Sequence, residues 1–369
     1  MDKLVLPGDI LRADEAIRAI PEIDLGPPIE VPQITPEAES TNISEDERQW
    51  LYSEIDRLAQ KIDALRLAHN YTPKDVQKKA DFVGDSIHLA KIGRASKKKV
   101  LIEASVLFMN QILAVMKQPG QIVLAPSLKA LCSLAAHADP NKILAWKHEH
   151  PKGKVISYVN TYLDVKAISD ICCASANAAK VIQYMTEKYP DDQLLFLPDV
   201  FLGYYAMDVL RKMGKSTDNL WLMMGACHVH EKITANHLRR QMILHPDAAV
   251  SAHMECGCVA KCVTMLNQGL ITKDRLNLGS TWSAIEFAKN TTHKKIIVAT
   301  TVTNIYPMSV VAPDKEFIPA NPEARCEFME QNTLRNLYES LRDMKYEIKV
   351  DPELAEKARK PIEKMLEIV

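Results

Sequence analysis

The sequence lacks the features that mark several large classes of protein. None of its apolar runs reaches the roughly 18 residues that a membrane-spanning helix needs. Its opening, MDKLVLPGDILRADEA, carries charges where a secretory signal peptide has an unbroken apolar stretch. The net charge is only −1, so no excess of positive charge draws the chain to nucleic acid or to an anionic membrane. We therefore expect a cytoplasmic protein that has neither a nucleic-acid nor a membrane partner.

Several catalytic motifs are also missing. The sequence contains no GxxxxGK[ST], no GxGxxG, no GxSxG and no HExxH. Nucleotide-driven chemistry, a dinucleotide cofactor and serine hydrolysis therefore lack their usual signals.

The composition is that of an ordinary globular protein with many thiols. The 369 residues are 47% hydrophobic and 25% charged, which is enough for two or three domains and a sizeable core. Eight cysteines in a reducing compartment are expected to stay thiols, which favours ligands or catalysts over disulfides.

Strands and helices alternate in three similar stretches of the chain. Each stretch opens with a short strand that ends in polar residues, continues through a serine-containing helix start, and closes with one cysteine. This alternation predicts an α/β fold of three similar domains, with parallel sheets and flanking helices. The predicted boundaries are a proline-rich N-terminal arm at 1–46, unit one at 47–138, unit two at 139–236, unit three at 237–330, and C-terminal helices that pack back on unit one at 331–369.

The N-terminal arm has a poor pattern for helix or strand, because it is rich in proline and acidic residues. It is interpreted either as an extended arm or as a leader without a function. Ser44 and Glu47 have the spacing of a capping box, which predicts that a helix starts directly after the arm.

One cysteine closes each of the three units, at Cys132, Cys227 and Cys326. We expect these thiols at the carboxyl ends of strands, where parallel α/β sheets bind ligands. Three thiolates suit an iron–sulfur cluster or zinc, and a cluster held by three cysteines leaves one iron open as a Lewis acid. The alternative is that each cysteine is a small apolar residue of the core.

The other cysteines have more local interpretations. Cys172 and Cys173 lie in a strand-like run, ISDICCASA, and are expected in the core. Cys256, Cys258 and Cys262 form the compact set ECGCVAKC. This trio either holds zinc together with a histidine, in a non-catalytic zinc-bound module, or consists of incidental thiols at a loop or helix start.

Hydroxyl residues recur where helices are expected to begin. Ser86, Ser175 and the Ser280–Thr281 pair each precede an apolar-periodic segment. Helix capping explains such residues, and an anion site at converging helix N-termini fits them equally well.

Polar residues also recur at the ends of the expected strands. Residues two apart on a strand share one face, and three such pairs occur: His69 with Tyr71, Tyr158 with Asn160, and His253 with Glu255. Beside a cluster, Glu255 is a candidate general base, and Tyr71 or His69 a candidate acid.

These residues lie in motifs that resemble the quinolinate synthase family. The matching stretches are AHNY, ADFVGDSIHLA, YVNT, SANA, FLPD, GACHVHEK, HMEC where the family has HPEC, GST, PDKEF and CEFM. They occur in the family's order over about residues 49 to 369, and the combination is specific although each short motif alone is weak.

The resemblance implies a fold, a cofactor and a reaction. The three domains would have pseudo-threefold symmetry around a central active-site cavity, with a [4Fe–4S] cluster on Cys132, Cys227 and Cys326. The enzyme would be a transferase that condenses iminoaspartate with dihydroxyacetone phosphate to quinolinate, with loss of phosphate and water, in de novo NAD biosynthesis. An enzyme that supplies iminoaspartate is a candidate protein partner.

The resemblance also implies which residues surround the substrates. Glu255 would move protons at the open iron, and the other catalytic residues would be Tyr71, His69 and His253. The substrate-binding residues would be Ser86, Tyr158, Asn160, Ser175, His230, Ser280 and Thr281.

Some positions depart from the family pattern. Gln111 stands where the family has a glutamate, and Thr300–Thr301 stand where it has a Thr-Glu pair. The stretch between Glu255 and Ser280 is longer than usual. The alternative reading is a diverged paralogue, a [4Fe–4S] hydro-lyase that acts on another small carboxylic acid.

Overall fold

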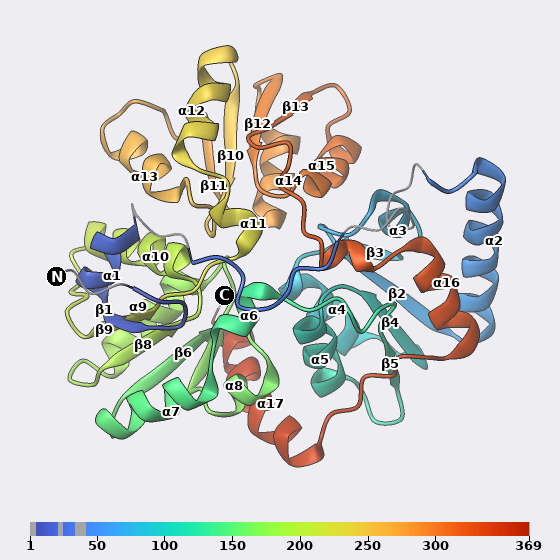
Figure 1. The fold of residues 1–369 in the computed structure, drawn as a ribbon, viewed down its shortest axis with the longest axis horizontal. Coiled ribbons are helices and arrows are strands. Elements are labelled where there is room, and N and C mark those ends of the chain that lie inside the picture. The colour runs from blue at the N-terminus through green and yellow to red at the C-terminus, as the bar shows by residue number, and fades with distance from the viewer. Residues whose placement is uncertain (1–4, 21–24, 34–41, 369) are drawn as a thin grey trace. The chain divides into compact units, whose positions relative to one another are not determined.

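The computed structural model describes residues 5–20, 25–33 and 42–368 (Figure 1). Contacts divide the chain into two compact units. The first unit comprises Met1–Ile29, Ser133–Ala324 and Glu356–Val369, and the second comprises Glu30–Cys132 and Arg325–Ala355.

The second unit is built on one parallel sheet with the strand order β3-β2-β4-β5. Its strands are β2 (Ala64–His69), β3 (Phe82–Gly84), β4 (Val100–Ala104) and β5 (Ile122–Leu124). Its helices are α2 (Glu45–Lys61), α3 (Lys74–Lys78), α4 (Ser86–Ala95), α5 (Leu107–Met116) and α16 (Leu334–Asp343), with a 3₁₀ turn, η5 (Met329–Gln331).

The first unit contains two sheets. The larger has the order β1-β9-β8-β6-β7 and is parallel except for β1. Its strands are β1 (Ile10–Arg12), β6 (Lys154–Tyr158), β7 (Ile171–Cys173), β8 (Leu194–Leu197) and β9 (Leu220–Met223). The helices along this part of the chain are α1 (Ala13–Ala19), α6 (Ser133–His137), α7 (Pro140–Glu149), α8 (Leu163–Ala167), α9 (Ala178–Lys188), α10 (Val200–Lys212) and α11 (His228–Glu231).

The other sheet of the first unit is wholly parallel, in the order β11-β10-β12-β13. Its strands are β10 (Ala249–His253), β11 (Leu276–Gly279), β12 (Lys295–Ala299) and β13 (Glu316–Pro319). The accompanying helices are α12 (Ala235–Leu244), α13 (Val259–Asn267), α14 (Thr281–Asn290), the 3₁₀ turn η4 (Val302–Asn304) and α15 (Ile305–Val311). The predicted α/β fold with parallel sheets and flanking helices is confirmed, and three sheets are consistent with three similar domains.

Helix α2 packs on the sheet of the second unit through one apolar stripe. Leu51, Ile55 and Leu58 follow the helical period and are buried. Their cluster includes Leu337 and Leu341 of α16. At the start of α2, the Ser44 hydroxyl accepts a hydrogen bond from the Glu47 amide at 3.2 Å, which confirms the predicted helix start.

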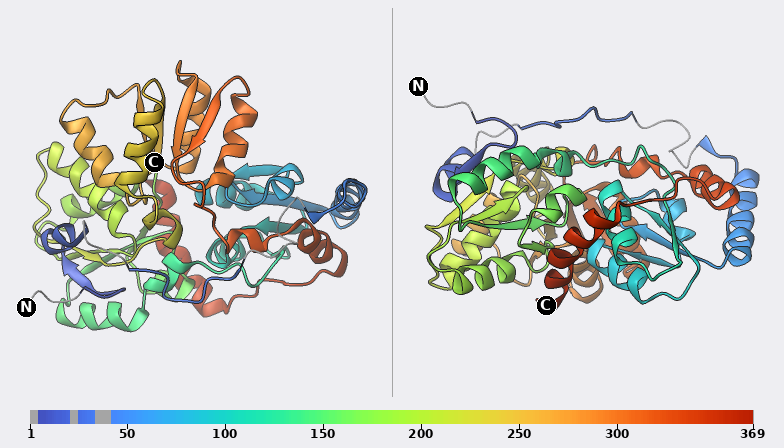
Figure 2. Two further views of the ribbon diagram at one scale, coloured as in Figure 1. Left: turned by 45° about the horizontal axis from the view of Figure 1, so that its top comes forward. Right: turned by 90° about the horizontal axis from the view of Figure 1, so that it is seen from below.

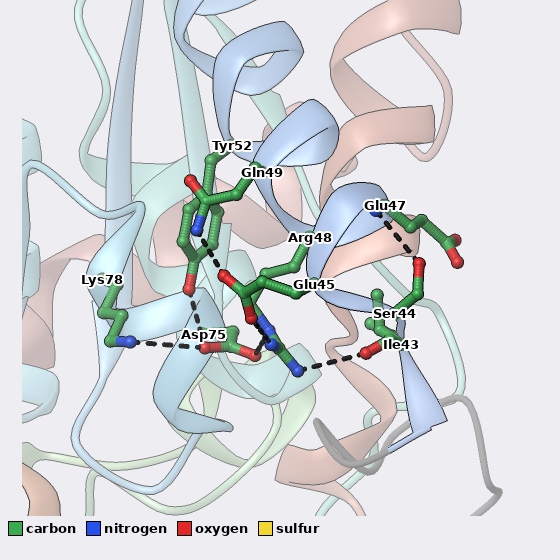
Figure 3. A network of polar contacts seen from close by, with 9 residues as sticks. All are labelled: Ile43, Ser44, Glu45, Glu47, Arg48, Gln49, Tyr52, Asp75 and Lys78. Atoms are coloured by element: carbon green, nitrogen blue, oxygen red, sulfur yellow. Dashed lines mark hydrogen bonds and ion pairs between the residues drawn. The ribbon is translucent and has the colours of Figure 1, made fainter.

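A buried carboxylate joins α2 to α3 (Figure 3). Asp75 accepts hydrogen bonds from Arg48 Nε at 3.0 Å and from the Tyr52 hydroxyl at 2.7 Å. Lys78 Nζ lies 3.8 Å from the same carboxylate, whose side chain is only 7% exposed. Because the charge is both paired and hydrogen-bonded, its burial is compensated.

The N-terminal arm contains regular structure that its composition did not predict. Strand β1 pairs antiparallel with β9, with Ile10 opposite Met223 and Arg12 opposite Trp221. Figures 1 and 2 show β1 and α1, in dark blue, at the β9 edge of the sheet. The unpaired backbone groups of an edge strand supply this pairing, and residue pattern plays little part in it.

The sequence predicts that the C-terminal helices pack on unit one. In the structure, the two helices have different neighbours. Helix α16 packs against α2. In the last helix, α17 (Pro352–Glu367), Lys364 Nζ donates to the Asp170 carbonyl at 3.0 Å. Asn177 Nδ2 donates to the Met365 carbonyl at 3.2 Å. This end of α17 therefore lies against elements of the β6–β9 sheet.

Two further expectations concern burial and length. Cys172 and Cys173 lie in β7 and are completely buried, which confirms that they belong to the core. None of the helices in the described ranges is both long and apolar enough to cross a membrane.

Candidate functional site

The strands of the first unit deliver polar side chains to one buried cluster. Strand β6 ends at Tyr158, and β10 ends at His253, two residues before Glu255. Strand β9 ends before Gly225 and leads into α11, which carries His230. The carboxyl ends of parallel strands are where α/β folds place ligands, so this meeting of side chains follows from the topology.

Glu255 is the centre of this cluster. Its Oε1 accepts a very short hydrogen bond from the Tyr158 hydroxyl, and its Oε2 lies 3.3 Å from His230 Nδ1. His253 Nδ1 lies 3.7 Å from Oε1. All four side chains are buried, at 6% exposure or less. A carboxylate with three polar neighbours can accept and return a proton without exchanging with bulk water.

The two histidines stack on each other. The ring centroids of His230 and His253 are 4.9 Å apart with an angle of 15° between the planes. His230 Nε2 lies 3.1 Å from the Thr300 hydroxyl, which fixes the ring from its other side. The ligand atoms of His230, His253 and Glu255 all lie within 4.8 Å of one another, so this trio could also hold a metal ion.

Electrostatics keeps Glu255 ionised and Tyr158 protonated. Burial alone would raise the pKa of Glu255, but the charges of His253 and His230 and the hydrogen bonds from His230 and Tyr158 lower it to about 2. Burial, together with the Glu255 charge, raises the pKa of Tyr158 well above its ordinary value. The arrangement therefore pairs an ionised carboxylate acceptor with a phenol donor.

Cys227 lies beside this cluster, in surroundings that favour its thiolate form. Burial opposes ionisation, but the charge of His230 and a hydrogen bond from His228 lower the pKa of Cys227 to about 5. His228 Nδ1 in turn lies 2.6 Å from the Ser133 hydroxyl. A half-buried thiolate at a strand end suits metal ligation, as the sequence predicted for this cysteine.

Two neighbours of this cluster were missed by sequence reasoning. Thr300 was noted only as a departure from a family pattern, yet it contacts His230. Asp199 is completely buried at the start of α10, where its Oδ1 accepts from the Leu202 amide at 2.7 Å. Burial and the Glu255 charge raise the pKa of Asp199 well above its ordinary value. The FLPD motif at the end of β8 was the available signal for Asp199.

The second unit holds the remaining strand-end pair. His69 ends β2, and its Nδ1 accepts a hydrogen bond from the Tyr71 amide at 3.1 Å. The two rings meet edge to face with centroids 4.8 Å apart, and both residues are buried. Cys132 and Cys326 also belong to this unit, and their thiols are half-buried. The three cysteines thus divide between the two units, and their meeting at one point stays a prediction.

The hydroxyl residues at the helix starts differ in what they do. Ser280 caps α14, accepting a hydrogen bond from the Ser283 amide at 3.3 Å. Asp85, and not Ser86, caps α4 by accepting from the His88 amide at 3.0 Å. At α9 the N-cap residue is Asn177, whose side chain makes no capping bond. The capping interpretation is therefore right for Ser280 and wrong for Ser86.

Other predicted substrate residues lie near these helix starts and strand ends. Ser175 hydrogen-bonds to the Tyr158 hydroxyl and so joins the Glu255 cluster. Asn160 follows β6 and is half-buried, and Thr281 is buried in the first turn of α14. Their proposed contacts with substrate stay predictions.

The cysteine trio lies around the start of α13 and is completely buried. Cys256 Sγ is 2.7 Å from Cys258 Sγ, and its thiol donates to the Ile233 carbonyl at 3.2 Å. Hydrogen bonding among the thiols and burial raise the pKa values of Cys258 and Cys262 well above the ordinary value. The structure therefore brings these thiols together at a helix start, and the choice between a zinc site and incidental thiols stays a prediction.

Comparison with known proteins gives one consistent result. A family model described as "Quinolinate synthetase A protein" matches residues 53–367. A quinolinate synthase of Thermus thermophilus is 38% identical over 318 residues, which cover 86% of this chain and 97% of the relative. A quinolinate synthase of Mycobacterium leprae is 37% identical over 322 residues, covering 87% and 89%. One of Pyrobaculum aerophilum is 38% identical over 318 residues, covering 86% and 99%.

Proposed function

The chain belongs to the quinolinate synthetase A protein family, and we propose that it condenses iminoaspartate with dihydroxyacetone phosphate to quinolinate. Phosphate and water leave as the pyridine ring closes, and the product would enter de novo NAD biosynthesis. The observation that carries the proposal is the ionised, buried Glu255, held by Tyr158 and two histidines at strand ends. Ring closure requires several proton transfers, and a sheltered carboxylate with a phenol partner suits them.

We propose that Cys132, Cys227 and Cys326 hold a [4Fe–4S] cluster. All three are half-buried cysteines, and Cys227 is already favoured as a thiolate, so the donor chemistry fits. Ser133 directly follows Cys132 and bonds to His228, which directly follows Cys227. When bound, a cluster with three cysteine ligands supplies one iron with an open coordination site, which acts as a Lewis acid on substrate oxygen.

The side chains of the chain would handle protons and orientation. Glu255 would take a proton from substrate and return it to the leaving hydroxyl, which departs as water. Tyr158 would hold Glu255 in place and donate to the developing negative charge. His230 and His253 would stabilise the carboxylate between transfers, and burial would keep bulk water out.

The substrates are anions, and three helix starts could hold them. Helices α4, α9 and α14 have 10, 11 and 10 residues, long enough to carry partial positive charge at their N-termini. We propose that residues at these starts bind the carboxylates and the phosphate, and that strand-end residues complete the pocket. The substrate-binding set is Ser86, Tyr158, Asn160, Ser175, His230, Ser280 and Thr281, with His69 and Tyr71 as further catalytic groups.

A second candidate is a hydro-lyase that acts on another small carboxylic acid. The observation that favours it is Gln111, at a position where the family has a carboxylate. Its Oε1 is buried without a hydrogen-bond partner among the described residues. An amide in place of a carboxylate changes both charge and hydrogen bonding, and with them substrate choice.

Anaerobic purification followed by assay separates these possibilities. The protein should be brown, should contain about four iron and four sulfide per chain, and should form quinolinate from iminoaspartate and dihydroxyacetone phosphate. Glu255→Gln should keep the colour and lose quinolinate formation. Quinolinate absent despite an intact cluster would favour the hydro-lyase. Colourless, iron-free protein after anaerobic reconstitution would refute the cluster and the chemistry that depends on it.

A further inference from the structure

Residues of the N-terminal arm contact both ends of the segment from Met224 to Glu231. At the first end, the Gly8 amide donates to the Met224 carbonyl and the Met224 amide donates to the Asp9 carbonyl, each at 2.7 Å. These bonds continue the antiparallel ladder between β1 and β9. The arm therefore fixes the backbone just before Cys227.

At the other end, the arm holds a carboxylate. The Leu25 amide donates to Glu231 Oε1 at 2.6 Å, and the Gly26 amide donates to Glu231 Oε2 at 3.2 Å. Hydrogen bonds to an ionised acceptor are roughly twice as strong as neutral ones. Gly26 has φ +60°, a conformation that glycine adopts without strain, and Leu25 is buried. Both oxygens of the carboxylate are thus engaged by backbone donors from the arm.

The segment between these contacts has little room to move independently. A Cβ on Gly225 would lie 2.6 Å from the Pro198 carbonyl oxygen. The Gly257 amide donates to the His230 carbonyl at 2.9 Å, and a Cβ on Gly257 would lie 2.6 Å from the Glu231 carbonyl oxygen. A shift of Glu231 is therefore transmitted to His230 and to the turn that follows Glu255.

The arm lies outside the part of the chain that the family model matches. The matching family model begins at residue 53, whereas the arm contacts come from residues 8–26.

We propose that Glu231 is a positioning residue. The Leu25 and Gly26 amides hold its carboxylate through hydrogen bonds, and the carboxylate in turn fixes the segment that carries Cys227 and His230. The inference rests on the proposed function, because positioning matters only if Cys227 and His230 serve the reaction. The N-terminal arm is then a working part of the enzyme and not a leader.

Hydrogen exchange of the intact protein tests directly whether these hydrogen bonds hold Glu231. Glu231→Gln removes the negative charge, and its side-chain NH₂ group then faces the backbone N–H of either Leu25 or Gly26. We expect the amides of Leu25, Gly26 and residues 224–231 to exchange about 10- to 100-fold faster, the change expected for losing hydrogen bonds to a charged acceptor. The control is Glu187→Gln, which removes an exposed carboxylate of the same unit that pairs with Lys215. It should leave these amides unchanged.

Steady-state kinetics distinguishes a positioning role from a role in the stability of the fold alone. Glu231→Gln should lower kcat by about 10- to 100-fold, with KM and melting temperature close to those of Glu187→Gln, because a small displacement of reacting groups is costly. Deleting residues 1–29 also removes the β1–β9 ladder, so its loss should be at least as large. Adding Glu231→Gln to the deletion should cause no further loss, because the deletion has already removed the Leu25 and Gly26 donors.

The outcomes are distinct. Unchanged exchange at residues 224–231 in Glu231→Gln would overturn the proposal, and so would losses from deletion and substitution that simply add. If the wild-type chain forms no quinolinate, the proposed function fails, while the exchange measurement still decides whether the arm holds Glu231. Faster exchange with unchanged kcat would overturn the positioning role, because the grip would then have no catalytic consequence.

Discussion

Replacing Tyr158 by phenylalanine removes one oxygen from the centre of the site. In the structure that oxygen donates a very short hydrogen bond to Glu255 Oε1, and both side chains are buried. The rest of the ring keeps its packing at the end of β6. The carboxylate of Glu255 would keep His230 and His253 as its remaining polar neighbours.

The magnitude follows from the value of a charged hydrogen bond. Losing a hydrogen bond to an ionised acceptor costs about 1.5–3 kcal/mol. This cost corresponds to a rise of roughly one to two pH units in the pKa of Glu255, which starts from about 2. The ionisation of Glu255 stabilises the fold above its ordinary pKa of 4.5, and this stabilisation is lost as pH falls towards about 2. In Tyr158→Phe the stabilisation is smaller, and its loss is complete at a higher pH.

The assay is the pH dependence of kcat/KM for quinolinate formation, under anaerobic conditions. We expect the acid limb of the profile to move to higher pH in Tyr158→Phe, and kcat near neutrality to fall about 100-fold or more if the phenol donates a proton. Tyr184→Phe is the matched control, because Tyr184 is exposed on α9 and its hydroxyl accepts a hydrogen bond from Lys188. An acid limb that stays in place, or moves to lower pH, would refute the assigned role of this bond.

Three further substitutions test other parts of the structure. Cys227→Ala should abolish iron, sulfide and colour after anaerobic reconstitution, whereas Cys172→Ala, in the core of β7, should keep them; equal metal content in both would refute the ligand assignment. Asp75→Asn should lower the free energy of unfolding by about 1–3 kcal/mol in urea, since the buried carboxylate binds Arg48 and Tyr52, and a change below about 0.5 kcal/mol would show that this network adds no stability. Leu337→Ala should cost about 2–5 kcal/mol in the same assay, because it leaves a cavity between α16 and α2.

The fold class was readable from the sequence because its signals are local. Apolar runs such as those ending near Cys173 and Met223 become buried strands, and the intervening amphipathic segments become helices. The start of α2 at Ser44 follows from a side chain that reaches only three residues ahead. Such features depend on neighbours in the chain, so periodicity and capping rules are sufficient.

Features that depend on distant partners were not readable in the same way. Strand β1 forms because β9 offers an unpaired edge, and the proline-rich arm itself gives no sign of this. Asp85 displaces Ser86 as the cap of α4 because it lies one residue earlier, at the non-helical position. The contact between Thr300 and His230 joins the residue that follows β12 to a residue of α11, which no local pattern encodes.

Two buried carboxyl groups in the first unit show why the acidity of a side chain cannot be predicted from the sequence alone. Both Asp199 and Glu255 follow apolar strands, and the sequence gives each the same ordinary acidity. In the structure, the positive charge of two histidines holds Glu255 ionised. Burial beside that negative charge raises the pKa of Asp199 well above its ordinary value, and its Oδ2 has no hydrogen-bond partner among the described residues. The same functional group therefore has its pKa shifted in opposite directions at two neighbouring positions, and the packing of β6, β8 and β10 decides which group is shifted which way.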